Sequence, residues 1–353
     1  MEEGMGSGHS HYGQKQVQTP VIGVKSLLDS MKDGIEFESL LQVKALNIDL
    51  VNEIRRSIGE IEKFRKKPLI CYLGNIVNTG IKVSTSIDYN DDLPFSEMIS
   101  LIPDENKDID IIIVTPGGSA QQVAKFVDKL RPRFQKVSFI LPNMSMSAGT
   151  IFVMSGDEII MGPNAYIGPI DPQVPNKDGI FVPAQAILAL KDDIQKRGEE
   201  SLKKGQNPPW SDLQILRQMD AKEIGNALSA SQYSIELVKN YLYRYKFNTW
   251  VKHSSDGRPV TDEDKRIKAE EIATHLCSHK EWKSHSRGIT RVAAWEECKI
   301  KITHTEEIEG LDRAIRRFWA LLYWVFENTG IAKIFISENY CIIRNDLSMI
   351  NKG

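Results

Sequence analysis

Hydrophobic positions in the first half of the chain follow two alternating patterns. Short, continuous apolar runs end at glycine or proline, as in PLICYLG at 68–74 and IDIIIVTPGG at 109–118. Such runs are typical of strands that are buried on both faces of a sheet. Between them, apolar residues recur three or four positions apart, which predicts helices with one apolar face, as for Val123, Phe126, Val127 and Leu130.

The same two patterns predict the neighbouring elements. Helices are expected around 51–61, from Pro94 and from about Ser147, and strands at 137–142 and 157–162. Strands that alternate with short helices indicate βαβ units. The sequence therefore predicts an α/β core with a parallel or mostly parallel sheet.

After about residue 183 the pattern becomes mostly helical. A long helical pattern covers 211–247, a polar stretch at 252–265 predicts a surface loop, and more helix follows to Phe326. The run FWALLYWVF at 318–326 is too short to span a bilayer and predicts a buried, aromatic-rich helix. Residues 332–337 predict a late strand.

These patterns divide the chain into three parts. Residues 1–40 begin with a polar, Gly/Ser-rich stretch and are expected to be mobile. Residues 41–210 form the α/β core, and residues 211–353 form a mostly helical region that is integral to the fold and is expected to serve oligomerisation.

Composition narrows the class of protein. A hydrophobic content of 41%, a charged content of 26% and a net charge of −2 are typical of a soluble globular protein, and they give no indication of nucleic-acid binding. The four cysteines form no CxxC pair, which indicates free thiols and no metal site. No signal-peptide pattern opens the chain and no GxxxxGK[ST] motif occurs, so we expect a cytoplasmic protein without ATPase activity.

Two small-residue turns have residues suited to chemistry. Gly117 and Gly118 follow a predicted strand, where backbone N–H groups without a neighbouring Cβ can approach a ligand and stabilise an oxyanion. Ser147 lies at a predicted strand-to-helix turn, and the small Ala148 and Gly149 leave room for a substrate carbonyl. Each turn also has a simpler interpretation, as an ordinary Gly-Gly turn and as a serine N-cap. For the nearby Ser145 the N-cap interpretation is favoured.

Three motifs together resemble a known family. They are TPGG at 115–118, MSAGT at 146–150 and GPIDPQ at 168–173, the last within GDEIIMGPNAYIGPIDPQ. The chain resembles the serine dehydrogenase proteinase family, relatives of signal peptide peptidase A within the Clp-protease/crotonase superfold. The resemblance runs from about Ile48 to about Ile302, and SHSRGITRVAAWEE is a looser match to a turn of that family.

The resemblance implies a fold and an activity. The fold would be a Clp-protease/crotonase-like βαβ-repeat core with a helical C-terminal region, and the activity that of a serine peptidase acting on peptide or protein substrates. Ser147 would be the nucleophile, the N–H groups of Gly118 and Ala148 the oxyanion hole, and Gly117 and Gly149 would bind substrate. A homo-oligomer without a metal or cofactor is also implied.

The general base is less clearly indicated. No histidine occurs between His11 and His253, so the arrangement of the Clp proteolytic subunit, with a histidine shortly after the serine, is absent. Relatives of signal peptide peptidase A use a lysine, and Lys191 lies 44 residues after Ser147 (191 − 147). A lysine base requires a lowered pKa, which apolar neighbours favour and the adjacent Asp192 and Asp193 oppose. A solvated surface lysine is the simpler interpretation, and Asp171 and His285 remain alternative candidates.

The favoured hypothesis is an ATP-independent cytosolic serine peptidase that forms an acyl-enzyme on Ser147. One alternative is a catalytically inactive member of the fold that binds peptides or acts as a scaffold. Another is acyl-thioester chemistry of the crotonase type, which needs an oxyanion hole but no nucleophilic serine, so Ser147 argues against it.

Overall fold

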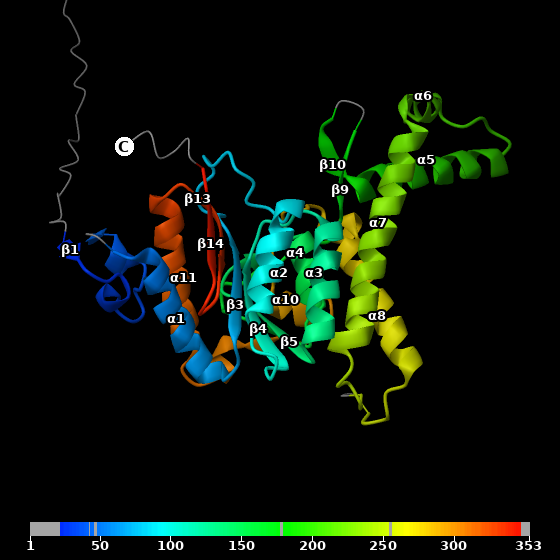
Figure 1. Cartoon of the computed structure of the whole chain (residues 1–353). Helices are drawn as coiled ribbons and strands as arrows, with labels where there is room; N and C mark the ends of the chain where they lie inside the picture. Colours follow the sequence, from blue (N-terminus) through cyan, green and yellow to red (C-terminus); the bar gives the residue numbers. More distant parts are fainter. Residues whose placement is uncertain (1–21, 42, 46–47, 177–178, 254–255, 347–353) are drawn as a thin grey trace, which may run out of the picture.

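A seven-stranded sheet lies at the centre of the computed structural model, which describes residues 22–41, 43–45, 48–176, 179–253 and 256–346 (Figure 1). Its strand order is β12-β7-β5-β4-β3-β13-β14. Strands β12 to β3 are parallel, and β13 and β14 add an antiparallel edge. The bounds are β3 Leu69–Gly74, β4 Asp108–Val114, β5 Lys136–Leu141, β7 Glu158–Met161, β12 Thr303–His304, β13 Ile331–Ile336 and β14 Cys341–Asn345.

Helices connect the parallel strands, as the sequence predicts. The α/β class with a mostly parallel sheet is confirmed, and the predicted helices are present as α1 Leu50–Arg65, α2 Asp92–Ser100, α3 Ala120–Arg133 and α4 Ala148–Met154. Two pairs of short strands lie outside the large sheet, β1 Ile22–Val24 with β2 Val43–Ala45 and β9 Gln173–Pro175 with β10 Phe181–Pro183.

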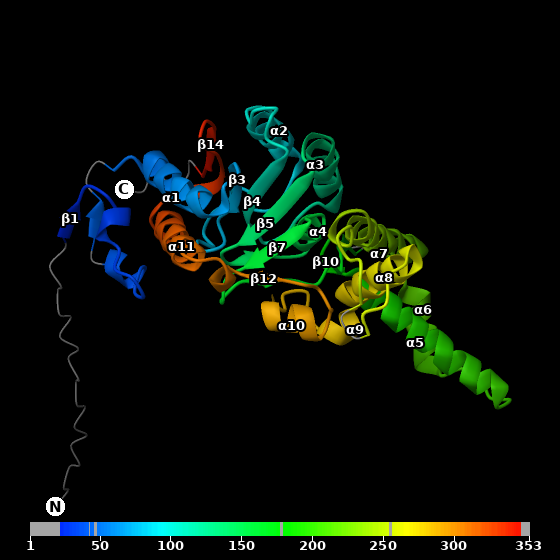
Figure 2. The same ribbon diagram turned by 90° about the horizontal axis from the view of Figure 1, so that it is seen from below.

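The sheet separates two apolar cores. Successive residues of a strand point to opposite faces, so Ile70 and Tyr72 of β3 belong to one core and Cys71 to the other. Helices α2, α3 and α4 cover the first face, and α1 and α11 (Leu311–Asn328) cover the second (Figure 2). Burial on both faces explains why the strands read as continuous apolar runs.

Part of the N-terminal segment packs against the second core. Leu27 and Leu28 are fully buried in the second core, and the Glu53 carboxylate accepts hydrogen bonds from the Leu28 N–H and the Ser26 hydroxyl. The structure thus packs residues 22–40 against the second core, whereas the mobility expected for 1–40 stays a prediction. Residues 1–21 lie outside the described residues.

The C-terminal region is mostly helical and is built into the fold. It contributes β12, β13 and β14 to the large sheet, of which β13 is the predicted late strand, and the buried helix α11 contains the aromatic run. Helix α8 begins inside the predicted loop because Thr261 and Asp264 form a capping box there. The remaining helices are α5 Ala184–Lys203, α6 Trp210–Gln218, α7 Ala221–Tyr241 with a π-helical turn at Leu242–Lys246, α8 Asp262–Cys277, α9 His279–Trp282 and α10 Arg291–Glu296.

Helices α5 and α6 form an arm that projects from the rest of the molecule (Figures 1 and 2). The first turns of α5 pack against α7 through Ala184, Ile187 and Leu188. Among the described helices, none combines the length and the apolar character that crossing a membrane requires.

A second, three-stranded sheet lies beside the carboxyl end of β4. Its order is β11-β8-β6, with bounds β6 Met144–Ser145, β8 Tyr166–Ile167 and β11 Ile289–Thr290. A backbone bridge between Thr115 and Ser145 joins it to the end of β4. The two turns with candidate chemistry therefore meet at the end of a parallel strand, where ligands bind in open α/β sheets.

Candidate active site

Ser147 occupies a strained turn between β6 and α4. Its φ is 50° and its ψ is −116°, a conformation that residues with a side chain rarely adopt. Such strain costs about 1–3 kcal/mol and persists where the surrounding structure enforces it, as at a nucleophile elbow. Ser147 stands at the N-cap position of α4, but its hydroxyl makes no capping hydrogen bond. The simple N-cap interpretation therefore does not account for this side chain.

Ser145 has a different environment. It is fully buried, its hydroxyl has no hydrogen-bond partner in the described part of the chain, and it belongs to β6 rather than to a helix N-cap. Its carbonyl oxygen lies 2.9 Å from the Thr150 hydroxyl. Ser145 thus lies beneath the turn, whereas Ser147 is partly exposed at its surface.

The two glycines after β4 lie against Ser147. Gly117 and Gly118 have φ values of 116° and 133°, which strongly favour glycine. A Cβ on Gly117 would come within 2.8 Å of the Ser147 Cβ. Glycine is therefore required at position 117, both by the backbone conformation and by the close approach to Ser147.

Two backbone N–H groups beside Ser147 are free to bind a ligand. Within the described residues, neither the Gly118 N–H nor the Ala148 N–H donates a hydrogen bond to another protein atom. The Ala148 N–H lies in the first turn of α4, where the helix dipole also favours negative charge. This arrangement has the donors that an oxyanion hole needs.

Gly149 is buried in α4 and is explained by packing. A Cβ there would lie 2.4 Å from the Thr115 Cγ2 and 2.6 Å from the Ser145 Oγ. Its role in substrate binding, like that of Gly117, stays a prediction.

A cleft of about 290 Å³ opens beside Ser147. Within the described residues its lining has no Asp, Glu, Lys or Arg. It contains apolar residues from several elements, uncharged polar side chains, and Ser147 and His285. The apolar residues are Pro116, Ala120, Ala148, Ile151, Ile170, Pro172, Phe181 and Ala230, and the other polar ones are Gln121, Gln173, Tyr233 and Ser234.

His285 reaches this cleft from the segment between α9 and β11. Burial lowers the pKa of its imidazole below the usual value, the backbone of Asp171 acts in the opposite direction, and the charge of His279 lowers it further. The Nδ1 atom is buried and has no hydrogen-bond partner among the described residues. A neutral imidazole with a lowered pKa can accept a proton near neutral pH.

Asp171 is buried and has contacts of its own. It is 1% exposed, its Oδ1 accepts a hydrogen bond from the Gln185 N–H at the start of α5, and its Oδ2 lies 3.4 Å from the His279 Nδ1. Burial raises the pKa of Asp171, although the Gln185 N–H and His279 oppose the shift. The carboxylate thus supports the first turn of α5.

Lys191 lies on the projecting arm. It is about 10 Å along α5 from Ala184, at 1.5 Å per residue, and its ammonium is 2.6 Å from the Asp192 carboxylate. It is not among the residues that line the Ser147 cleft in the described chain. Lys191 as the base stays a prediction, and of these two residues it is His285 that lines the Ser147 cleft in the single chain. In the sequence, His285 is indicated only by the segment SHSRG, the looser match to a turn of the family.

The family resemblance is confirmed by comparison with known proteins. Residues 37–204, a little less than half of the chain, match the model of the ClpP-like SDH-type serine proteinases. This segment contains both glycine turns, Ser147 and all of α5, so the similarity to that family covers Ser147 and the turns beside it.

Two curated relatives match parts of the chain. Both are uncharacterized proteins of Methanocaldococcus jannaschii, one 33% identical over 42% of this chain and 50% of its own length, the other 41% identical over 27% of this chain and 33% of its own length. The chain thus spans at most half of either relative.

Two solved structures are also similar. One is the ClpP protease catalytic domain from Plasmodium falciparum, 18% identical over 31% of this chain and 57% of that chain, with a TM-score of 0.24. The other is a mutant of the 1510-N membrane-bound stomatin-specific protease, 20% identical over 36% of this chain and 63% of that chain, with a TM-score of 0.26.

Proposed function

We propose that this protein is a serine peptidase that hydrolyses peptide bonds through an acyl-enzyme on Ser147. The observation that carries the proposal is the strained turn of Ser147, whose uncapped hydroxyl lies beside the free N–H groups of Gly118 and Ala148. The match of residues 37–204 to the model of a serine proteinase family supports it.

The reaction follows from these positions. The Ser147 Oγ attacks the substrate carbonyl carbon while a base takes its proton, and the Gly118 and Ala148 N–H groups bind the oxyanion. The C–N bond then breaks as the base returns the proton to the leaving amine, and water hydrolyses the ester on Ser147. Each oxyanion donor contributes about 2.7–4 kcal/mol to such a transition state.

His285 is the base that the single chain favours, because it lines the same cleft as Ser147 and its pKa is lowered by burial. Lys191 is the alternative that the sequence favours. To act on Ser147, Lys191 would have to reach the cleft through a rearrangement of α5, and its ammonium would have to lose a proton.

The cleft supports peptides as the substrate class. Its lining combines apolar with uncharged polar side chains and has no Asp, Glu, Lys or Arg among the described residues, which suits an uncharged side chain next to the scissile bond. We further propose that hydrolysis needs no ATP and takes place in the cytoplasm. An inactive peptide-binding protein is the second candidate, and its support is the separation of Lys191 from the cleft.

A serine-directed fluorophosphonate tests this proposal. We expect intact protein to gain the mass of one phosphonyl group, and tryptic peptides to place it on Ser147, because the free oxyanion donors stabilise the phosphonyl oxygen. The same labelling after heat unfolding is the control, since it removes the turn and should remove the reaction. A folded protein that gains no phosphonyl mass would favour the inactive alternative.

We also propose that the chain forms a homo-oligomer through its arm. Helices α5 and α6 expose several large apolar side chains, which monomeric proteins seldom gather in one place. These are Leu190, Leu202, Trp210, Leu213, Ile215 and Leu216, with exposed fractions of 42%, 64%, 75%, 42%, 37% and 41%.

Light scattering at micromolar concentration is expected to give a multiple of the 39.9 kDa chain mass. Leu202→Arg, which places a charge on the arm, should lower that mass, whereas Val251→Arg should not, although Val251 is equally exposed at 66%. A wild-type mass of about one chain would overturn the proposal. An unchanged mass for Leu202→Arg would exclude this part of the arm as the interface.

A further inference from the structure

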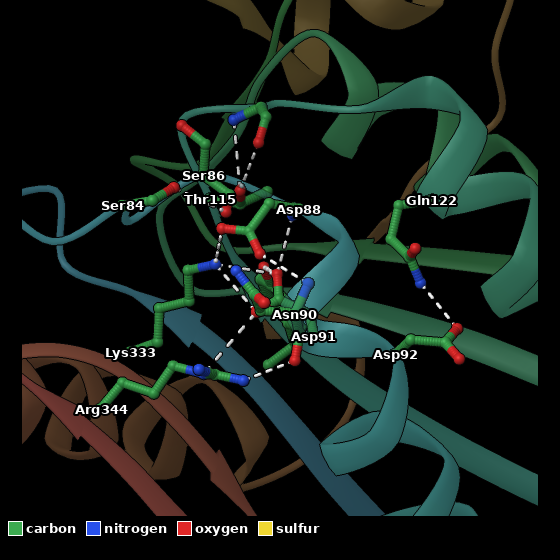
Figure 3. A network of polar contacts seen from close by, with 12 residues as sticks. Ser84, Ser86, Asp88, Asn90, Asp91, Asp92, Thr115, Gln122, Lys333 and Arg344 are labelled. Carbon is green, nitrogen blue, oxygen red and sulfur yellow. Dashed lines mark hydrogen bonds and ion pairs between the residues drawn. The ribbon is translucent and has the colours of Figure 1, made fainter.

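A lysine is buried in the strand next to β3. Lys333 of β13 is 1% exposed, and its ammonium lies 2.8 Å from the Asp91 Oδ2 and 3.0 Å from the Asp88 Oδ2 (Figure 3). Burying a charge is unfavourable unless it is paired and hydrogen-bonded, so these contacts hold both carboxylates firmly in place.

The two aspartates form a single tight turn. The Asp91 Oδ2 also accepts hydrogen bonds from the Tyr72 hydroxyl at 2.7 Å and from the Asp88 N–H at 2.9 Å. Burial opposes ionisation of Asp88, but the hydrogen bond and charge of Lys333 outweigh it and hold the pKa of Asp88 below its usual value. Burial and the nearby Asp91 raise the pKa of Tyr72, so its hydroxyl remains a donor. The turn is thus fixed by charge-assisted hydrogen bonds.

Ile87, the residue just before Asp88, is hydrogen-bonded to the backbone on both sides of Gly118. The Ile87 N–H donates to the Gly117 carbonyl at 2.7 Å, and the Ile87 carbonyl accepts from the Ser119 N–H at 2.9 Å. The approach is so close that a Cβ on Gly118 would lie 2.2 Å from the Ile87 oxygen. Ile87 therefore holds the peptide groups on both sides of Gly118.

This bonding sets the direction of an oxyanion donor. The Gly117 C=O and the Gly118 N–H belong to one planar trans peptide, so they point in opposite directions. With the carbonyl directed at Ile87, the Gly118 N–H points to the other side of the strand, and Gly118 lines the cleft beside Ser147. Two consecutive glycines have little conformational preference of their own, so an outside restraint is needed to maintain this direction.

We propose that Lys333 is a positioning residue for the peptidase reaction. Its ammonium holds Asp88 and Asp91, they hold Ile87, and Ile87 aims the Gly118 N–H at the oxyanion. None of the three charged side chains is among the residues lining the cleft, so they act through the backbone alone. This inference rests on the proposed function.

Asp88→Asn is the decisive variant. It keeps the size of the side chain and an acceptor for the Asn90 N–H, but it removes the charge that pairs with Lys333. We expect kcat for a peptide substrate to fall about tenfold, a fraction of what losing a whole oxyanion donor costs, while KM changes less than twofold. Amide hydrogen exchange of residues 115–119 should become faster, a readout that does not depend on activity.

Asp92→Asn is the matched control. Asp92 follows the same turn, but its carboxylate accepts from the Gln122 amide at 2.9 Å (Figure 3). It also pairs with Lys129 at 2.6 Å. Asp92→Asn should leave both kcat and the exchange of 115–119 unchanged. Lys333→Met, which takes from the buried Asp91 the ammonium 2.8 Å away and leaves it the Tyr72 hydroxyl and the more distant Arg344, should lower the thermal unfolding midpoint as well as kcat.

The outcomes separate this inference from the proposed function. If wild-type protein reacts with the fluorophosphonate and Asp88→Asn remains folded with unchanged kcat and exchange, the positioning role is wrong and the peptidase stands. A rise in KM alone would also overturn it. If wild-type protein does not react at all, the proposed function fails and this inference fails with it.

Discussion

Ser147→Ala is expected to abolish peptide hydrolysis, on the order of 10⁴-fold or more, while the protein stays folded and keeps its assembly. The hydroxyl makes no capping hydrogen bond, so its removal takes no partner from another group. Alanine meets the same steric conditions as serine at a φ of 50°, so the turn is retained. Initial rates on a fluorogenic peptide measure the loss, and circular dichroism with a thermal scan measures the fold.

Ser145→Ala is the control for that result. Ser145 is buried and its hydroxyl has no hydrogen-bond partner in the described chain, so removing the hydroxyl should be neutral or slightly stabilising. Most of the activity should remain. If the Ser145 variant were inactive and the Ser147 variant active, the nucleophile would have been assigned to the wrong serine.

The strands and helices around Ser147 could be predicted from local sequence because their periodicity is strong. Ile111, Ile112 and Ile113 are buried on alternate faces of β4, so the run has no polar position except Asp110, which pairs with Arg65. The turn after β4 could also be predicted, because two consecutive glycines at the end of a strand are typical of positive φ values and close backbone packing.

The short elements could not be predicted. Strands β6, β8 and β11 have two residues each, and their register comes from pairing with distant segments rather than from periodicity. Leu27 and Leu28 likewise lie in a stretch without a helical or strand pattern, and only the fold brings them to Glu53.

The general base depends on the fold for the same reason. Spacing along the chain favours Lys191, whereas the approach of His285 to the cleft depends on how α8, α9 and β11 return to the sheet. A helix such as α5 also shows an amphipathic pattern whether it packs on the core or projects from it. The sequence therefore does not show how far Lys191 or His285 lies from Ser147 in the folded chain.

The pH dependence of kcat/KM is expected to distinguish the two bases. The pKa of His285 is lowered from its usual value near 6.5, chiefly by burial, and the neutral form that accepts a proton is populated above that pKa. With His285 as the base, activity should therefore rise with pH through the mildly acidic range and level off by about pH 7. A lysine base, with a usual pKa of about 10.4, should instead give activity that still rises above pH 8.

Substitution of the two candidate bases is expected to identify the base independently of the pH dependence. His285→Gln keeps much of the side-chain volume but cannot act as a base, so kcat should fall about 10²–10⁴-fold, as for the loss of a general base. Lys191→Ala should retain most activity, like its control Lys196→Ala on the exposed surface of the same helix. The reverse result, an inactive Lys191→Ala beside an active His285→Gln, would mean that α5 rearranges to bring Lys191 to Ser147. Fluorophosphonate labelling of each variant shows whether Ser147 still lies in its reactive turn, because a folded site without its base should label slowly rather than not at all.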